Sequence, residues 1–282
     1  MMFTVLGSGG FIGGQLVDAL EAIDRAAVYA PLPKDGADIS DEIFDRDLGH
    51  VFYCIGLTAD FRSRPLDTVK AHVCLLRRLL DRGRFESLTY LSSTRVYEGA
   101  ATTDESTILQ VDPTNPGHLY NLSKLMGESL CHASGHNARV VRLSNVFGRA
   151  MPAQNFISRV FHEAASTGKV QFLTSSRTAK DYVSVNDVVR WLPQIAQHGI
   201  HSIYNVASGT NLSNAGIASL LEQKRIVVGF SEGAPDWSFP VIDNNRLVEE
   251  FGGAQSSLAN EFEYLFDCFI NHDNGIEDER IT

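Results

Sequence analysis

The stretch FTVLGSGGFIG at residues 3–13 places Gly7, Gly10 and Gly13 at intervals of three, directly after an apolar run. Gly7 permits a tight turn from strand to helix, Gly10 lets the backbone approach a ligand, and Gly13 allows the helix to pack closely on the strand. A helix that opens after Gly10 aims its first backbone amides at the turn, where they favour a diphosphate. The stretch therefore predicts a cradle for a dinucleotide, with a purely structural strand-turn-helix as the alternative.

Short apolar strands and amphipathic helices alternate along the chain beyond this turn. Strands are predicted at residues 3–6, 27–30, 51–55, 88–92, 140–143 and 203–207, and helices at 12–23, 66–82, 116–133 and 186–197. Such alternation is typical of a parallel sheet covered on both faces, with right-handed crossovers. The expected fold class is α/β, a Rossmann-type doubly wound sheet.

Two segments fall outside this repeat. We expect residues 149–180 and 209–270 to form a smaller, interleaved substrate-binding lobe over the carboxyl edge of the sheet. Residues 1–148 and 181–208 would then form the dinucleotide-binding core. The acidic residues 271–282 hold little that can pack, so a frayed tail is expected there.

Composition limits the classes of partner. The chain of 282 residues is 44% hydrophobic and 21% charged, which is typical of a soluble globular protein. A net charge of −10 with no basic stripe disfavours nucleic acid as a partner, and no apolar run is long enough to cross a membrane. The four cysteines form no C-x-x-C pair, which favours the reducing cytoplasm. His132 and His136 are four apart without an evident third ligand, so no metal site is expected.

Tyr120 and Lys124 are four residues apart in a predicted helix. Asn115 and Pro116 are suited to the N-cap and first turn of this helix, and Gly135 is suited to its end. At this spacing the two side chains share one face. A tyrosine hydroxyl titrates near pH 10, so it acts as a base only where a cation such as a lysine ammonium stabilises the phenolate. Chance occurrence on an amphipathic helix is the alternative explanation.

Ser93 lies at the end of the apolar strand predicted at residues 88–92. A hydroxyl at the carboxyl end of a central strand points into the crevice where doubly wound folds bind ligands. Ser93 is therefore a candidate to orient a reacting oxygen against Tyr120. The alternative is a polar strand terminus that satisfies turn backbone.

Together these features resemble the extended short-chain dehydrogenase/reductase family, which includes nucleotide-sugar epimerases, dehydratases and 4-ketoreductases. The resemblance covers nearly the whole chain. The similar segments, in chain order, are GSGGFIG at 7–13, Asp38-Ile39, SSTRVY at 92–97, Tyr120 with Lys124, RLSNVFG at 142–148, KDYVSVNDV at 180–188 and YNVASG at 204–209.

The resemblance implies an NAD or NADP cofactor, with NAD favoured, and hydride transfer on a nucleotide-diphosphate sugar by an epimerase or ketoreductase. Tyr120 would move the hydroxyl proton, Ser93 would orient the oxygen, and Lys124 would hold the cofactor ribose and the phenolate. The implied cofactor-binding residues are Gly7, Gly10, Phe11, Ile12, Gly13, Asp38, Ile39 and Lys124. The implied substrate-binding residues are Ser93, Asn145, Arg177 and Arg246. A homodimer through the helices at 66–82 and 116–133 is also implied, and Phe61 and Arg62 are candidates to line the pocket.

The chain also departs from the family pattern. His72 stands near a position where many members have asparagine, and it either replaces that contact or is a core or surface histidine. Residues 27–33, at the end of the second strand, contain no carboxylate. NAD and NADP therefore both stay open, and Lys34 either meets a 2′-phosphate or faces water. Thr94 and Arg95 stand where dehydratases carry an acidic pair, which disfavours dehydration. The sugar, its nucleotide and the carbon attacked stay open, and a non-catalytic cofactor-binding sensor or scaffold is the alternative function.

Overall fold

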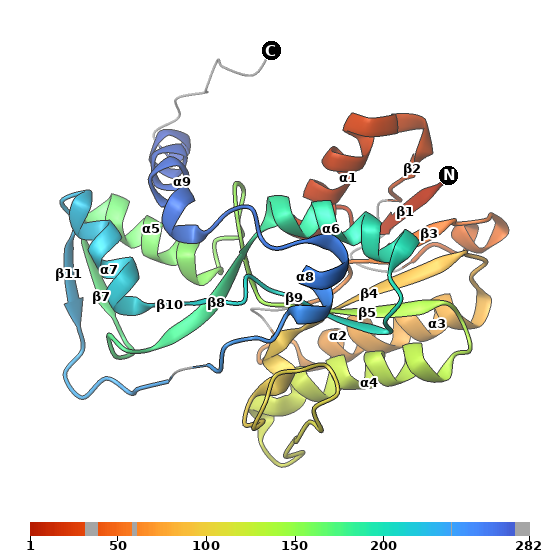
Figure 1. Ribbon diagram of the computed structural model, residues 1–282, viewed down its shortest axis with the longest axis horizontal. Helices are drawn as coiled ribbons and strands as arrows, with labels where there is room; N and C mark the ends of the chain where they lie inside the picture. Colours follow the sequence, from red (N-terminus) through yellow and green to blue (C-terminus); the bar gives the residue numbers. More distant parts are fainter. Residues whose placement is uncertain (32–38, 58–60, 238, 274–282) are drawn as a thin grey trace.

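A parallel sheet forms the centre of the computed structural model, which describes residues 1–31, 39–57, 61–237 and 239–273 (Figure 1). Its strands lie in the spatial order β2-β1-β3-β4-β5-β9. Their bounds are β1 Phe3–Leu6, β2 Val28–Tyr29, β3 His50–Tyr53, β4 Ser87–Ser93, β5 Ala138–Leu143 and β9 Ile203–Val206. The doubly wound α/β fold expected from the sequence is confirmed.

The direction in which strands are added reverses at β1. The chain passes from β1 to β2 on one side and returns to β3 on the other. A reversal of this kind opens a crevice at the carboxyl ends of the two strands that flank it. The crevice is bordered by Gly7, which follows β1, and by Cys54 and Ile55, which follow β3.

Helices cover both faces of the sheet. Figure 1 shows α1 (Phe11–Asp24) and α6 (Val185–His198) on one face, with α3 (Leu75–Arg82) and α4 (Leu119–Ala133) on the other. Successive strand residues alternate between the two faces. Thus Leu91 packs in the cluster beneath α6, while its neighbour Tyr90 packs in the cluster beneath α3 and α4.

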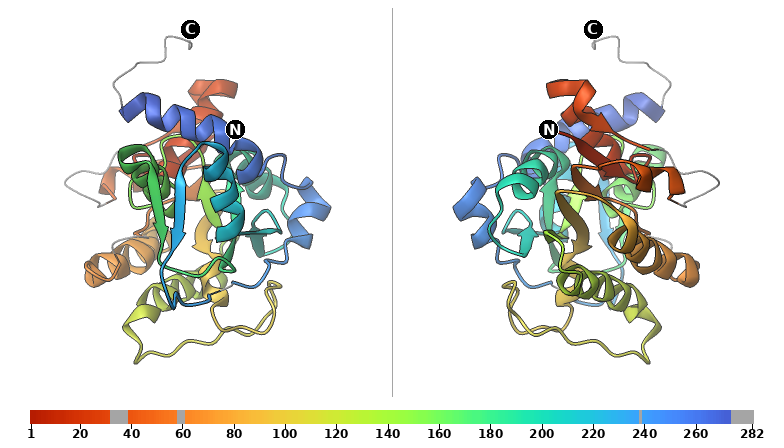
Figure 2. Two further views of the ribbon diagram at one scale, coloured as in Figure 1. Left: turned by 90° about the vertical axis from the view of Figure 1, so that its left-hand side faces the viewer. Right: turned by 90° about the vertical axis from the view of Figure 1, so that its right-hand side faces the viewer.

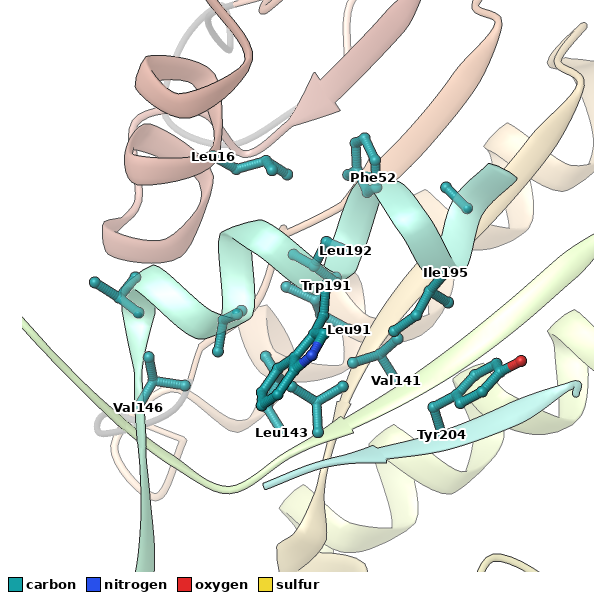
Figure 3. Packing of buried hydrophobic residues seen from close by; sticks show 14 of the residues in the cluster. Leu16, Phe52, Leu91, Val141, Leu143, Val146, Trp191, Leu192, Ile195 and Tyr204 are labelled. Carbon is teal, nitrogen blue, oxygen red and sulfur yellow. The ribbon is translucent and has the colours of Figure 1, made fainter. Parts of the chain in front are cut away.

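Trp191 of α6 lies in the middle of the first cluster. Figure 3 shows its indole among side chains from the sheet, including Leu91, Val141 and Leu143. Trp191 is fully buried, and its Nε1 donates to the Gly252 carbonyl oxygen at 3.1 Å. This bond ties the segment after α8 (Asn245–Phe251) to the core, where Leu247 is also buried.

The helix predicted at 66–82 is confirmed, but it is not regular. It begins as α2 (Pro65–Val69), widens into a π-helical turn at Lys70–Cys74 and continues as α3. The extra residue in this turn rotates the following residues, so that the adjacent Ala71 and His72 are both buried. Hydrophobic periodicity alone does not signal such a turn.

A second group of elements packs beside the sheet, at the left of Figure 1. Its cluster centres on Phe161 of α5 and includes Phe262 and Phe266 of α9, and the left-hand view of Figure 2 shows these helices from that side. The strands of this group form a three-stranded sheet, β10-β8-β6, and a two-stranded sheet, β11-β7. The elements are β6 Asn145–Phe147, α5 Phe156–Thr167, β7 Lys169–Phe172, β8 Ala179–Ser184, β10 Asn211–Ser213, α7 Asn214–Gln223, β11 Val227–Phe230 and α9 Leu258–Asp273. The helix α9 includes the first three residues of the tail expected to fray, and residues 274–282 lie outside the described part of the chain.

One buried carboxylate ties these elements to the central sheet. Asp181 of β8 is 3% exposed and accepts from Ser144 Oγ, directly after β5, at 2.5 Å. After β9, it accepts from Ser208 Oγ and Gly209 N, both at 2.8 Å, and from Thr210 N at 3.1 Å. One side chain of β8 therefore joins the ends of β5 and β9, where the chain leaves the central sheet for the second group. In the described residues, no helix is long and apolar enough to span a bilayer.

Candidate active site

The glycine turn has the geometry that the sequence predicts. Gly7 has a φ of +92°, and a Cβ there would lie 2.9 Å from the backbone of Cys54 and Ile55. A Cβ on Gly13 would lie 2.2 Å from the Gly7 carbonyl oxygen, while Gly10 N donates to that same oxygen at 3.0 Å. Side chains at Gly7 and Gly13 would therefore break the turn.

The open end of this turn suits an anion. The N-cap of α1 is Gly10, which provides no side-chain cap, and the first turn of α1 has no acidic residue. The hydroxyl of Ser8 is buried and has no hydrogen-bond partner among the described residues. Unpaired backbone amides and a buried hydroxyl are groups that a diphosphate would satisfy, so these residues fit a dinucleotide cofactor.

The other implied cofactor residues occupy different surroundings. Phe11 and Ile12 are partly buried and pack against the cluster beneath α6. Ile39 is buried with Ile43 and Phe44 in the cluster on the opposite face. Asp38 and Lys34 lie outside the described residues.

Tyr120 and Lys124 are both buried on one face of α4. The start of this helix follows the predicted pattern, because the Asn115 side chain accepts the Gly117 amide in a 3₁₀ turn that begins at Pro116. Tyr120 is 4% exposed, and the Lys124 Nζ lies 6.0 Å from the centre of its ring. The two side chains therefore lie together, as their spacing predicts.

The ammonium group of Lys124 is held without a close carboxylate in the described structure. Its Nζ donates to the Leu91 carbonyl oxygen of β4 at 2.8 Å. Burial lowers the pKa of Lys124 to about 7, although the carboxylate of Glu128 acts in the opposite direction. A Cβ on Gly56, after β3, would lie 3.4 Å from Nζ, so Lys124 borders the crevice.

Ser93 ends β4 next to this pair. Its hydroxyl accepts the backbone N–H of Arg95 at 3.2 Å and so caps the 3₁₀ turn Thr94–Tyr97. The guanidinium carbon of Arg95 in turn lies 5.7 Å from the centre of the Tyr120 ring. Ser93 thus lies two residues before the arginine that approaches Tyr120, and its hydroxyl satisfies turn backbone in the way the alternative expected.

His72 packs edge-on against the Tyr120 ring, with 5.4 Å between the ring centres. The Nε2 atom accepts the Leu57 amide at 3.2 Å, so the opposite Nδ1–H donates to Ser123 Oγ at 2.8 Å. Ser123 Oγ then donates to the Tyr120 carbonyl oxygen at 2.8 Å. Burial lowers the pKa of His72 to about 2, with Lys124 adding to the effect, so the imidazole is neutral. His72 is therefore a buried, hydrogen-bonded histidine that joins the loop after β3 to α4.

Two features of the site were missed by the sequence analysis. One is the direction of Arg95, whose guanidinium carbon lies near both the Tyr120 ring and the Phe61 ring, 5.1 Å from the centre of the latter. Its position two residues after Ser93 was the available signal. The other is a buried network in which Glu128 of α4 accepts from Ser92 at 2.5 Å and from Arg142 at 2.7 Å.

Phe61 and Arg62 both line a groove of about 380 Å³ at the start of α4. The ring of Phe61 also lies 5.4 Å from that of Tyr120, centre to centre. The wall of the groove thus contacts the tyrosine. The remaining lining residues are Pro65, Pro113, Asn115, Pro116, Leu119 and Leu122.

The candidate substrate residues beyond Ser93 lie on three separate elements. Asn145 of β6 is exposed and donates to the Asp181 carbonyl oxygen at 2.8 Å. Arg177 precedes β8, is largely exposed and pairs with Asp236 at 2.7 Å. Arg246 of α8 pairs with Glu105, which is buried, at 3.3 Å. Each arginine thus has a carboxylate partner within the protein.

Comparison with known proteins gives the family. The family model described as "NAD dependent epimerase/dehydratase family" matches residues 3–207. No curated protein matches the chain.

Solved structures give the fold. The chain is similar to MoeE5 in complex with UDP-glucose and NAD, with 22% identity, a TM-score of 0.79, and 97% of this chain and 100% of that chain covered. It is similar to UDP-glucuronic acid 4-epimerase from Bacillus cereus, with 18% identity, a TM-score of 0.79, and coverage of 96% and 99%. It is also similar to RMD from Pseudomonas aeruginosa complexed with NADPH, with 21% identity, a TM-score of 0.78, and coverage of 96% and 100%. With the family match over most of its length, this chain belongs to the NAD dependent epimerase/dehydratase family and is an enzyme of the extended short-chain dehydrogenase/reductase type.

Proposed function

We propose that this enzyme is an epimerase or ketoreductase that transfers hydride at a ring carbon of a nucleotide-diphosphate sugar. The observation that carries the proposal is the buried pair of Tyr120 and Lys124, beside Ser93 at the carboxyl edge of the sheet. The glycine cradle opens at the same edge. When bound there, the nicotinamide of the dinucleotide supplies the hydride acceptor and donor.

The protein's own residues handle the proton and the position of the sugar. Tyr120 Oη takes the proton of the sugar hydroxyl in the oxidative direction and returns it in the reductive direction. Ser93 Oγ donates to the reacting oxygen and orients it towards Tyr120. The Lys124 ammonium, anchored on the Leu91 carbonyl, binds the cofactor ribose and adds positive charge beside the phenol.

Thr94 and Arg95 favour epimerisation or ketone reduction over dehydration. Loss of water from a sugar needs an acid and a base beside the active-site hydroxyl. Thr94 is buried and Arg95 lies over the Tyr120 ring, so neither of these two positions supplies a carboxylate.

We propose that residues 149–180 and 209–270 form the substrate-binding lobe and that Arg177 is a better candidate than Arg246 for the diphosphate. The pair of Arg177 with Asp236 is exposed, so exchanging the carboxylate for a phosphate costs little. Exchanging the partner of Arg246 would leave the buried carboxylate of Glu105 unpaired. Asn145, on the edge strand β6, is a further candidate for the sugar.

We also propose a homodimer through the helical segments 66–82 and 116–133, and a cytoplasmic location. Leu66 and Met126 on these segments are 84% and 53% exposed, which favours burial against a second copy. The four cysteines are free, which fits a reducing compartment.

The test is a panel of nucleotide sugars offered to the wild-type enzyme and to Tyr120→Phe, with and without NADH and NADPH. We expect the variant to keep dinucleotide affinity and lose about 10²- to 10⁴-fold in turnover. Stoichiometric consumption of cofactor would identify a reductase, and product without consumption would identify an epimerase. Unchanged turnover in the variant contradicts the mechanism, and dinucleotide binding without turnover on any sugar favours the non-catalytic sensor.

A further inference from the structure

Positive charge is concentrated around Tyr120, although the whole protein carries a net charge of −10. The Arg95 guanidinium carbon lies 5.7 Å from the centre of the Tyr120 ring, and Lys124 Nζ lies 6.0 Å from it. The mechanism proposed above gives Arg95 no role in binding the sugar or moving the proton. Arg95 nevertheless lies beside the phenol, where the reacting sugar would bind.

The hydrogen-bonding capacity of Arg95 is only partly used within the described part of the chain. Its Nε is buried without a hydrogen-bond partner and forms a long ion pair, of 3.6 Å, with the Glu98 carboxylate. Its Nη2 makes one long hydrogen bond, of 3.4 Å, to the Gly117 carbonyl oxygen. Since a guanidinium has five N–H donors in a fork that matches a carboxylate, Arg95 has donors left for a ligand.

Lys180 of β8 adds a third cation, which lies close enough to Arg95 for their charges to interact. Its Nζ lies 4.8 Å from the centre of the Trp237 ring and 5.4 Å from that of Phe156, and it forms no ion pair with the described carboxylates. Burial lowers the pKa of Lys180, and the charge of Arg95 contributes to this shift. The two cations therefore repel one another, and an anion between them would relieve that repulsion.

We propose, building on the function proposed above, that the reacting sugar carries a carboxylate that Arg95 binds, with Lys180 adding to the positive potential. The substrate class is then a nucleotide uronic acid. A neutral sugar offers the terminal N–H groups of Arg95 only hydroxyl acceptors, whereas a carboxylate can accept from them in charge-assisted hydrogen bonds.

The experiment compares matched ligands that differ only at C6. Dissociation constants are measured by calorimetry, with NAD present, for UDP-glucose against UDP-glucuronate and for GDP-mannose against GDP-mannuronate. Tyr120→Phe serves as the background, so that turnover is slow during the titration. We expect the carboxylated member of one pair to bind about 10- to 100-fold more tightly. Arg95→Gln should remove this preference and leave affinity for the neutral sugar and for free UDP or GDP within about twofold.

Arg84→Gln is the matched control, because Arg84 is exposed and donates to the Asp45 carbonyl oxygen before β3. Equal binding of both members of a pair overturns this inference and leaves the proposed function standing. If Arg95→Gln weakens free UDP or GDP as much as the uronate, Arg95 binds the diphosphate and the inference is also wrong. If no member of either pair binds, the proposed function itself fails.

Discussion

Arg142 and Lys124 are two buried cations near Glu128 that differ in their partners. Arg142 of β5 forms three hydrogen bonds to the Glu128 carboxylate, at 3.1, 3.3 and 2.7 Å, and donates to the Tyr97 hydroxyl at 2.7 Å. Burial acts to lower the pKa of Arg142, but these partners hold it above its ordinary value. Lys124 has only the Leu91 carbonyl as a hydrogen-bond partner in the described structure, and its pKa falls to about 7.

This difference separates a charge that holds the fold from a charge that we propose binds a ligand. The Arg142 guanidinium and the Glu128 carboxylate satisfy one another and fix α4 against β4 and β5. Lys124 lies one turn away on the same helix, where its ammonium is desolvated and unpaired. Since burying an unpaired charge destabilises a protein, its presence here indicates a role in binding or catalysis.

Breaking the ion pair between Arg142 and Glu128 should have the largest effect on stability. Arg142→Met leaves Glu128 buried without its partner, and we expect a loss of about 3–5 kcal/mol in the free energy of unfolding. Urea denaturation followed by circular dichroism measures it. The double variant Arg142→Met/Glu128→Met should recover most of this loss, because it leaves no buried charge. A double variant as unstable as the single one would show that packing, and not the unpaired carboxylate, causes the loss.

Removing the unpaired charge of Lys124 should stabilise the folded protein, whereas breaking the ion pair of Arg142 destabilises it. We expect Lys124→Met to raise the free energy of unfolding by about 1–3 kcal/mol at pH 7 and to lower turnover severely. The folded protein without dinucleotide binds the Lys124 proton more weakly than the unfolded chain does, because the pKa is about 7 in one and 10.5 in the other. The lysine therefore destabilises the fold fully below pH 7, and this penalty fades as the pH approaches 10.5.

The difference in melting temperature between Lys124→Met and the wild-type protein, scanned from pH 6 to pH 10, checks this expectation. The difference should be largest at pH 6 and 7 and shrink steadily above. A difference in melting temperature that stays constant across this range would mean that burial does not lower the pKa of Lys124 in the folded protein.

The smallest effect is expected at His72, which bears no charge at neutral pH. His72→Leu removes the acceptor of the Leu57 amide and the donor to Ser123, so we expect a loss of about 1 kcal/mol. Chemical denaturation measures it, with His132→Leu, an exposed position on α4, as the control. If both variants lose the same free energy of unfolding, the hydrogen bonds of His72 make no specific contribution to stability.

The local features of the fold could be predicted from sequence. The turn at Gly7 and the face shared by Tyr120 and Lys124 depend on spacing within a few residues, and spacing is visible in the sequence. The two-residue length of β2 and the π-helical turn at His72 were not predicted, since both depend on packing with distant elements.

Contacts between residues far apart in the sequence were also not predicted. Asn205 donates to the Thr103 carbonyl oxygen at 2.7 Å, and Arg246 pairs with Glu105, yet nothing in the local pattern links these segments. The depressed pKa of Lys124 likewise depends on how deeply the folded chain buries it. The sequence thus predicted that Tyr120 and Lys124 lie together, but not the surroundings that shift the pKa of Lys124.

The carboxylate of Asp181 has a consequence for how the active site opens. It joins the ends of β5 and β9 to β8 through hydrogen bonds, which are directional in a way that apolar contacts are not. The angle at which the smaller group of helices and strands stands over the sheet is therefore set by the orientation of a few N–H and O–H bonds. A substrate that bridges the two parts would enter an opening whose width is established before it arrives.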